Sequence, residues 1–382
     1  MNHKMKIAHI SILPAFSPGI FKKLEDKAKI SRENNLGIDF YLLNPEKALV
    51  DKNLYVMKQE YKYIPFRFLK TVFFRLFKMC SIMKLIRLEE YDAIVLRYPL
   101  VDGFCNTKYA LKYGKKTITE HHTNEISELI AVGRPIDILR AFIEKNFSGN
   151  FLSKMAGCIG VTNEIVQIQA KKIDIFIPRM AIANGINPDS YKKIDFVSFD
   201  KKTLKMLFIA TEFSPWHGLE SILNAIANYT GECNITLHLV GSVNQNQRKI
   251  IQDRLSKSVE IVIHGKLYGE DLDRLFIHIN IAISSLSMSK NNMLEGSTLK
   301  SREYIVRGIP FIYAYKDTDL VGDEIFAKRF EETKINIEEI IQFASDVSIQ
   351  REDVLKAMAQ KEIDISWLNK LKQIKSFVEQ NL

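Results

Sequence analysis

The chain has 382 residues, which exceeds the size of one ordinary hydrophobic core and favours two domains. Its composition, 46% hydrophobic and 26% charged, excludes a disordered or fibrous protein. The net charge of +9 is a modest excess, compatible with an anionic substrate, a membrane surface or a nucleic acid, and it does not decide among them.

The four cysteines, Cys80, Cys105, Cys158 and Cys233, show neither a CxxC motif nor a paired spacing. This distribution argues against a zinc site and against a disulfide framework, and it favours a reducing compartment. The apolar run within residues 1–13 is too short for the core of a signal peptide and is typical of a first strand. No stretch approaches the ~18 apolar residues of a membrane span, so we expect a cytoplasmic protein.

Short apolar strands alternate with segments of helical length along the whole chain, which predicts parallel sheets with right-handed crossovers and an α/β fold. In the first half, strands are predicted at residues 6–13, 38–43, 91–98, 116–122 and 157–162, and helices at 21–35, 107–114 and 164–173. In the second half, strands are predicted at 205–210, 235–242, 261–265, 281–286 and 311–315, and helices at 218–229, 247–258, 270–279 and 299–308.

Asn-Gly and Asn-Pro pairs punctuate residues 182–196, so the two halves are expected to be separate domains, 1–185 and 186 onward. Ligands of open parallel sheets bind at the carboxyl ends of the strands, where helix N-termini also lie. A crevice between two such sheets is therefore the expected binding site.

The stretch LEGSTLKSREYIVRGIP (294–310) carries two carboxylates, Glu295 and Glu303. On one helix they would lie about 80° apart and would share no face. If a helix begins at Ser297 or Thr298, Glu295 lies in the preceding loop and Glu303 about one and a half turns inside. The free backbone N–H groups between them would then hold an anion flanked by two acceptors of hydroxyl hydrogen bonds.

A nucleotide diphosphate suits this arrangement. Ser297, Thr298 and Leu299 offer backbone donors, Lys300 adds charge near the phosphates, and Glu303 suits a ribose diol. The alternative is that Glu303 is a solvated helix residue and that its partner carboxylate only favours the helix dipole.

Two further loops follow predicted strands of the second half. Residues 216–218 follow the strand predicted at 205–210. Here His217 is a candidate to donate a hydrogen bond to a phosphate, and the alternative is a helix-capping loop with a packed Trp216 before Gly218. Gly265 and Lys266 follow the third, where glycine allows the backbone to approach a base or sugar closely.

The order of these features resembles the C-terminal domain of GT-B glycosyltransferases, and most closely glycosyltransferase family 4, whose members are retaining enzymes that use nucleotide sugars. The order is strand, loop and helix, a strand ending in Val-Gly, a strand ending in Gly, Glu-x7-Glu, then Gly-Ile-Pro and a strand. The match runs from about Asn184 to Tyr315. Residues 361–382 resemble the closing helix of the family, which packs back on the first domain, so the second domain is expected to end at 360.

The resemblance implies that Glu295 contacts the donor sugar, that Glu303 holds the ribose, and that the amides of residues 297–299 bind the pyrophosphate. The sequence departs from the family at one point. Family members usually place an Arg and a Lys in the loop before the first helix of this domain, whereas here His217 stands in the place of the Lys and no Arg is present. We expect His217 and Lys266 to share the neutralisation of the diphosphate.

In the first half, His121 and His122 end a predicted strand. The resemblance implies that His122 faces the donor sugar, while the leaving diphosphate helps to deprotonate the acceptor. His121 is expected to point inward as a structural residue, and hydrogen-bonded packing of both rings is the alternative. Gly19, in the loop after the first strand, is expected to approach the diphosphate through its backbone.

Residues 61–88 carry seven basic and seven aromatic residues and no acid, a composition typical of an interfacial amphipathic helix. Lys70, Arg75 and Lys78 are the residues expected to face the acceptor or the membrane. The alternative is an ordinary helix with a solvated basic face and a buried aromatic face. Interleaved basic and aromatic residues also suit single-stranded nucleic acid, but nothing else in the sequence supports it.

The sequence therefore predicts a retaining, metal-independent glycosyltransferase of GT-B architecture that needs no cofactor. It would move a sugar from a UDP- or GDP-sugar to a glycan or lipid-linked glycan in bacterial surface polysaccharide synthesis (capsule, O-antigen or exopolysaccharide), at the inner face of the plasma membrane. A non-catalytic GT-B-like subunit that binds a nucleotide sugar or a partner is the alternative. A dinucleotide-dependent oxidoreductase would need a G-x-G-x-x-G turn, which the chain lacks, and no nucleic-acid partner is expected.

Overall fold

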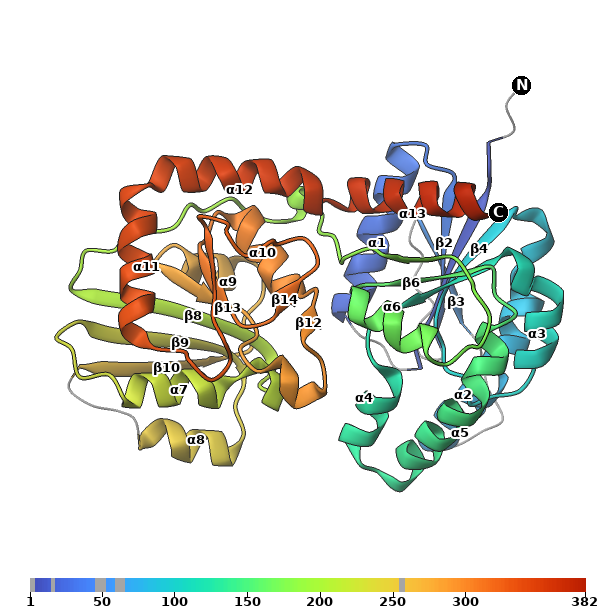
Figure 1. The fold of residues 1–382 in the computed structure, drawn as a ribbon, viewed down its shortest axis with the longest axis horizontal. Coiled ribbons are helices and arrows are strands. Elements are labelled where there is room, and N and C mark those ends of the chain that lie inside the picture. Colours follow the sequence, from blue (N-terminus) through green and yellow to red (C-terminus); the bar gives the residue numbers. More distant parts are fainter. Residues whose placement is uncertain (1–3, 15–17, 45–52, 59–65, 254–257) are drawn as a thin grey trace. The chain divides into compact units, whose positions relative to one another are not determined.

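The computed structural model describes residues 4–14, 18–44, 53–58, 66–253 and 258–382. The chain forms two compact units (Figure 1). The first comprises Met1–Ala183 and Trp367–Leu382, and the second comprises Asn184–Ser366. The sequence had placed these boundaries at residues 185 and 360.

The first unit is built on a seven-stranded parallel sheet of order β3-β2-β1-β4-β5-β6-β7. Both faces are buried, because Ile7 of the central strand joins one hydrophobic core while Ala8 and Ile10 join the other. This explains the unbroken apolar runs of the sequence. The strands are β1 (Ile7–Ile12), β2 (Ile38–Asn44), β3 (Leu54–Lys58), β4 (Ala93–Arg97), β5 (Thr117–His121), β6 (Gly157–Gly160) and β7 (Arg179–Ala181).

Helices cover both faces of this sheet. The helices are α1 (Pro18–Glu33), α2 (Arg67–Leu85), α3 (Asn106–Tyr113), α4 (Glu125–Val132), α5 (Pro135–Leu152), α6 (Asn163–Ala170) and α13 (Trp367–Asn381), with short 3-10 turns η1 (Leu88–Glu90) and η2 (Gly114–Lys116). One core contains residues of α1 and α13, and the other contains residues of α2, α3 and α5. No helix of the described residues is both long enough and apolar enough to cross a membrane.

The closing helix α13 belongs to the first unit although it follows the second unit in the chain. Trp367, Leu371 and Ile374 are buried in the same core as Leu24 of α1. The ammonium group of Lys27 lies 4.6 Å from the centre of the Trp367 ring, a cation–π contact that fixes the first turn of the helix.

The second unit has a six-stranded parallel sheet of order β10-β9-β8-β11-β13-β15 and a short parallel pair, β12 and β14. The strands are β8 (Thr203–Glu212), β9 (Asn234–Ser242), β10 (Val259–Gly265), β11 (Ile281–Ile283), β12 (Glu295–Gly296), β13 (Phe311–Tyr313), β14 (Lys316–Asp317) and β15 (Ala327–Arg329). The helices are α7 (Leu219–Ala227), α8 (Gln245–Gln252), α9 (Gly269–Phe276), α10 (Leu299–Arg307), α11 (Ile337–Ile349) and α12 (Arg351–Ile365), with 3-10 turns η3 (Pro188–Ser190), η4 (Pro215–His217) and η5 (Met288–Asn291). The α/β fold with parallel sheets is thus confirmed. The helix expected at 247–258 ends earlier, and residues 254–257 lie outside the described part of the chain.

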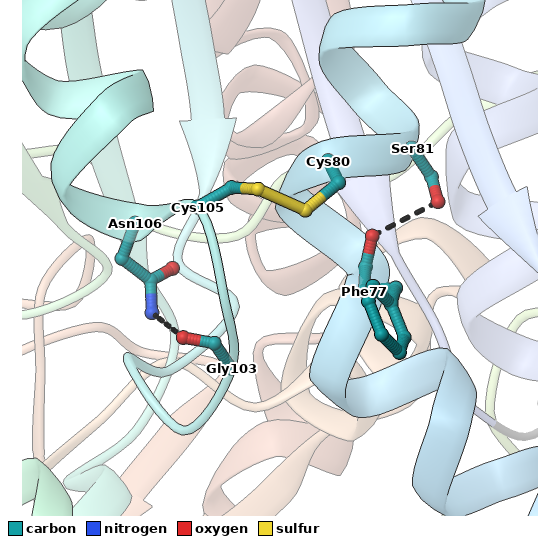
Figure 2. Close-up of a disulfide and its surroundings, with 6 residues drawn as sticks. All are labelled: Phe77, Cys80, Ser81, Gly103, Cys105 and Asn106. Carbon is teal, nitrogen blue, oxygen red and sulfur yellow. Dashed lines mark hydrogen bonds between the residues drawn. A yellow bond between two sulfur atoms is a disulfide. The ribbon is translucent and has the colours of Figure 1, made fainter.

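A disulfide joins Cys80 of α2 to Cys105, the residue that precedes α3 (Figure 2). The sequence had argued against a disulfide framework, and it gave no sign of this bond. The two residues lie 25 positions apart, and it is the packing of α2 against the loop before α3 that brings their Cα atoms within 5.5 Å of each other. The backbone N–H of Phe104 donates to the carbonyl of Leu76 (2.6 Å), and a Cβ on Gly103 would lie 2.6 Å from the carbonyl oxygen of Arg75, so only glycine allows this approach.

Removing the disulfide with Cys80→Ser and Cys105→Ser is expected to lower the free energy of unfolding by ~3 kcal/mol, because the unfolded chain is released from the loop that the bond closes. Urea denaturation of the double variant measures this, with Cys233→Ser, which leaves the bond intact, as the control. Thiol titration of the denatured, non-reduced wild type should find only the free thiols of Cys158 and Cys233. Titration of all four cysteines would contradict the pairing.

Candidate functional site

The loop between β8 and α7 carries His217. The Nδ1 atom of this ring accepts a hydrogen bond from the backbone N–H of Ser214 (3.1 Å), which places the proton of the neutral ring on Nε2. Burial and the nearby charge of Lys300 lower the pKa of His217 to about 3, so the ring is neutral at pH 7. His217 therefore offers one N–H donor and no charge.

This loop is tied to the loop that follows β11. The carbonyl of His217 accepts from the backbone N–H of Leu286 (2.9 Å), and that of Trp216 accepts from Ser287 (3.3 Å). Gly218 has φ +80°, and a Cβ on it would lie 2.7 Å from the Cβ of Leu286. Glycine is thus required for the two loops to meet, and the loop has the capping geometry that the alternative interpretation expected.

The N-terminus of α10 follows closely on β12, so the helix begins near the predicted position, whereas Glu295, expected in a loop, lies on this short strand. Thr298 is the N-cap residue, and its side chain accepts from the backbone N–H of Ser301 (3.4 Å), so Leu299 and Lys300 begin the helix with backbone N–H groups that have no intrahelical partner. The hydroxyl groups of Thr298, Ser301 and Tyr315 lie 2.6–2.8 Å from one another and fix this end of the helix. Ser297 is held separately, because its Oγ accepts from the backbone N–H of Asn184 (2.8 Å).

Lys300 has the most unusual environment at this helix end. Its Nζ atom is buried and has no hydrogen-bond partner among the described residues. The ammonium lies 5.5 Å from the centre of the Phe208 ring of β8. Burial lowers the pKa of Lys300 to about 7. An unpaired buried ammonium is costly, and it marks a place where an anion would be stabilised.

The two glutamates of the motif differ in environment. Glu295 begins β12, and its side chain is partly exposed. Glu303 lies inside α10, where its Oε1 accepts from Nε of Arg307 (2.8 Å) and burial raises its pKa. Arg307 also pairs with Asp273 of α9 (2.6 Å). Glu303 is thus not the solvated helix residue of the alternative interpretation, and within the described part of the chain its second carboxylate oxygen has no donor, which leaves it to accept from a ligand hydroxyl.

Sequence reasoning missed Arg302, which organises the site. Its guanidinium is fully buried, with one nitrogen 2.7 Å from Oδ1 of Asp317 and a second contact to the same carboxylate. It also pairs with Asp319 (2.9 Å) and donates to the carbonyl of Asn184 (3.2 Å). Asp317 lies on β14, the partner strand of β12, so Arg302 holds the strand that carries Glu295. A lone Arg in a helix pattern gives no signal of this role.

Of the remaining residues predicted to bind the donor, Lys266 lies apart from this cluster and Leu299 lies at its edge. Lys266 is exposed beyond β10, the edge strand, and no described hydrogen bond or ion pair joins it to His217 or Lys300. Leu299 is the first residue of α10, and its side chain is 44% exposed, so only its backbone N–H is available to a ligand.

In the first unit, His122 follows β5 and belongs to a buried network. Its Nε2 lies 3.2 Å from Oε2 of Glu120, and its Nδ1 lies 3.5 Å from Nζ of Lys23. Glu120 also pairs with Lys27 (3.2 Å) and with His9 (3.0 Å). Burial, followed by the charge of Lys23, lowers the pKa of His122 well below its usual value. His122 is therefore a neutral ring, oriented by Glu120.

His121 points inward, as predicted. It is fully buried, its Nδ1 lies 2.6 Å from Glu125, and this carboxylate raises the pKa of the ring to about 9 against the effect of burial. Gly19 was expected in a loop, but it lies in the first turn of α1, next to residues 15–17, which are outside the described part of the chain. A Cβ on Gly19 would meet no atom within 4 Å, so the fold itself does not require glycine there.

The expectation that Lys70, Arg75 and Lys78 face a membrane or acceptor together is wrong for Lys78. Its ammonium is buried and paired with Asp102. Arg75 is partly buried, and burial lowers its pKa, while Lys70 is partly exposed. The basic residues of α2 are thus distributed between the core side and the surface, because an α-helix turns residues 70, 75 and 78 in different directions.

No protein-family profile and no curated protein matches the chain. Among solved structures, its fold is similar to that of the apo form of a lipopolysaccharide outer core galactosyltransferase, WaaB, at 11% identity and TM-score 0.64, covering 99% of this chain and 100% of that one. It is also similar to sucrose-phosphate synthase from Thermosynechococcus elongatus (16%, TM-score 0.63, 98% of each chain). A third similar structure is HepE from Anabaena in complex with UDP-glucose (13%, TM-score 0.60, 98% of this chain and 100% of that one). The chain has the GT-B fold of these glycosyltransferases, as the motif order predicted.

Proposed function

We propose that this chain is a glycosyltransferase that binds a nucleotide diphosphate sugar in its second unit, with the diphosphate at the N-terminus of α10. The observation that carries the proposal is the buried, unpartnered ammonium of Lys300 beside the free N–H groups of that helix and the neutral ring of His217. The UDP-glucose bound by the structurally similar HepE is consistent with a UDP-sugar donor.

The chemistry follows from the charges. When the bond to the sugar breaks, negative charge develops on the leaving diphosphate, and groups already aimed at that charge lower the barrier. Lys300 would supply the positive charge, Leu299 and Lys300 the backbone donors, and His217 a neutral N–H. These groups would neutralise the diphosphate in place of the Arg and Lys that family members carry in the loop between β8 and α7. We propose on this basis that the reaction needs no metal or other cofactor.

The remaining assignments follow the motif. Glu303 would hold the ribose, Glu295 would contact the donor sugar, and His122 would act in the transfer step rather than in donor binding. We propose a retaining transfer to a glycan or lipid-linked glycan in bacterial surface polysaccharide synthesis, at the inner face of the plasma membrane.

The first test is a thermal-shift panel of the pure protein against UDP, GDP, ADP, CMP and their common sugar conjugates without added metal. Selective stabilisation by one diphosphate supports the proposal and names the base. The absence of any shift at millimolar concentration would overturn it. Stabilisation by a donor that is neither hydrolysed nor transferred would instead favour the non-catalytic subunit, which the missing Arg and Lys keep as the second candidate.

The two glutamates are expected to separate donor binding from turnover. Glu303→Gln should weaken donor binding about tenfold, because it loses charge-assisted hydrogen bonds to the ribose. Glu295→Gln should keep donor affinity and lower kcat about 100-fold, because its contact matters most in the transition state. Steady-state kinetics with calorimetric donor binding measures both. Wild-type constants in both variants would show that the motif is not the donor site.

A further inference from the structure

Large apolar side chains are exposed over the hairpin formed by α4 and α5. Asn124 caps α4 by accepting from the N–H of Ser127 (3.2 Å), Gly133 ends it with φ +72°, and Pro135 begins α5. Six side chains between 42% and 62% exposed lie within residues 130–142, around the turn of the hairpin, and Phe147 (58%) follows further along α5: the six are Ile130, Val132, Ile136, Ile138, Leu139 and Phe142. Single exposed apolar residues are ordinary, but six within one hairpin mark an interaction surface. We call these six residues the hairpin surface.

Three of the four acidic residues of α4 and α5 are buried, and the fourth, Glu128, is exposed. Asp137 is 1% exposed and lies 2.5 Å from Arg134 and 3.0 Å from Arg140. Glu144 is fully buried and accepts from the hydroxyl of Tyr98 (2.7 Å). The side chain of Arg134, in contrast, is 63% exposed. The hairpin therefore presents apolar groups and the cation of Arg134, while the carboxylates of α5 are paired and buried and Glu128 of α4 remains exposed.

The surface extends toward α2. Asp102 pairs with Lys78 of α2 and with Arg140 of α5 (2.5 Å), so the two helices lie beside each other (Figure 1). The N-terminal half of α2 exposes Phe66 (66%), Leu69 (39%) and Phe73 (40%). These three side chains add apolar area next to the hairpin.

We propose that the hairpin surface, together with the exposed side chains of α2, docks on a lipid bilayer with anionic headgroups. The apolar side chains would enter the boundary between headgroups and acyl chains, and Arg134 and the overall charge of +9 match an anionic leaflet. Both acids of α5, Asp137 and Glu144, are buried and would not repel such a leaflet. The sequence had assigned this role to the cations of α2, and the structure assigns it to apolar groups, mainly of the hairpin.

A cavity of the first unit lies next to the hairpin surface, where it could receive the polar end of an acceptor held in the bilayer. The cavity has a volume of about 290 Å³ and is lined by Leu129, Val132 and Arg134 of the hairpin and by His122 and Glu120. An acceptor whose lipid anchor remains in the bilayer would have its polar end beside the cavity. This last step, a lipid-linked acceptor, rests on the proposed function, whereas the docking itself does not.

Vesicle flotation of the full chain tests the docking. The probes are vesicles of phosphatidylcholine with about 30% phosphatidylglycerol, compared with phosphatidylcholine alone. The variant Ile138→Gln/Leu139→Gln/Phe142→Gln changes only exposed side chains, and we expect it to weaken partitioning into the anionic vesicles about tenfold. The control, Val321→Gln/Ile349→Gln/Ile363→Gln, changes residues of the second unit that are more exposed still (79%, 79% and 72%) and should partition like the wild type.

Three outcomes would overturn the proposal. In the first, the hairpin variant floats as well as the control. In the second, flotation is lost only with Phe66→Gln/Leu69→Gln/Phe73→Gln, which would assign the contact to α2 alone. In the third, the wild type does not float and sedimentation shows a dimer that the hairpin variant dissociates, which would make the partner a second copy of the chain. The hairpin variant should keep any thermal shift with nucleotide diphosphates, so failure of donor binding and failure of docking are distinguishable.

Discussion

Lys300→Met is expected to weaken the binding of the nucleotide diphosphate about 10- to 100-fold, because it removes a charged hydrogen bond to the phosphates. The same change should leave the stability of the free protein unchanged or raise it, because the wild type buries an ammonium that has no hydrogen-bond partner among the described residues. A variant that is more stable but binds less is the signature of a ligand site. Calorimetric binding and urea denaturation provide the two measurements.

The pH dependence gives a second readout of the same residue. Burial lowers the pKa of Lys300 to about 7, so the free protein loses this charge as the pH rises through 7. A bound diphosphate favours the charged form, so binding takes up a proton and wild-type affinity should fall from pH 7 to 9. Between pH 7 and the ordinary lysine pKa, the unfolded chain holds more protons than the folded chain, so the contribution of this group to stability rises with pH.

The matched control for Lys300 is Lys266→Met. Lys266 is exposed and has no described contact with the cluster, so its replacement should change diphosphate affinity little. The phosphates of the ligand also titrate in this pH range. The ratio of the wild-type affinity to the Lys300→Met affinity at each pH therefore reports the effect of the lysine alone. Equal affinities at every pH would remove Lys300 from the site. A larger loss with Lys266→Met would restore the expectation that Lys266 neutralises the diphosphate.

Arg302→Met is expected to lower the free energy of unfolding by about 3–5 kcal/mol, because it leaves the carboxylate of Asp317 buried without its partner. Arg302→Lys should recover little of this loss, because a lysine cannot bond to both oxygens of Asp317 while reaching Asp319. The double variant Arg302→Met/Asp317→Leu should be more stable than Arg302→Met alone, because it removes the unpaired charge.

Urea denaturation measures this series, with Arg274→Met as the control. Arg274 makes only exposed contacts with Glu270 (3.5 Å) and Asp271 (3.6 Å), which contribute less than about 1 kcal/mol. Arg302→Met should also lower activity, since β14 supports the strand that carries Glu295. A loss no greater than that of the control would show that the buried pair does not stabilise the unit.

The sequence predicted most of what depends on local pattern. Apolar runs located the central strands of both sheets, and Gly218 together with the start of α10 were predicted from loop and cap residues. The hairpin of α4 and α5 was not assigned, because its apolar side chains face outward and interrupt the one-sided pattern of a core helix.

Contacts between distant segments could not be predicted. Arg302 meets Asp317, and Cys80 meets Cys105, only after the helices pack. Likewise, the sequence showed that Lys300 follows a helix start, but only the packing of its side chain over Phe208 revealed that its ammonium is buried. Burial depends on the surrounding fold, which spacing in a sequence does not specify.

The return of α13 to the first unit has a consequence for biosynthesis. The second unit is one continuous segment and has all of its residues as soon as Ser366 has left the ribosome. The first unit starts earlier but lacks Trp367, Leu371 and Ile374 of its core until the final helix is made. Domains fold as they emerge from the ribosome. The second unit can therefore complete its fold before the first unit, although the first unit is synthesised first. Until α13 is made, the apolar surface of the first unit that this helix covers stays exposed.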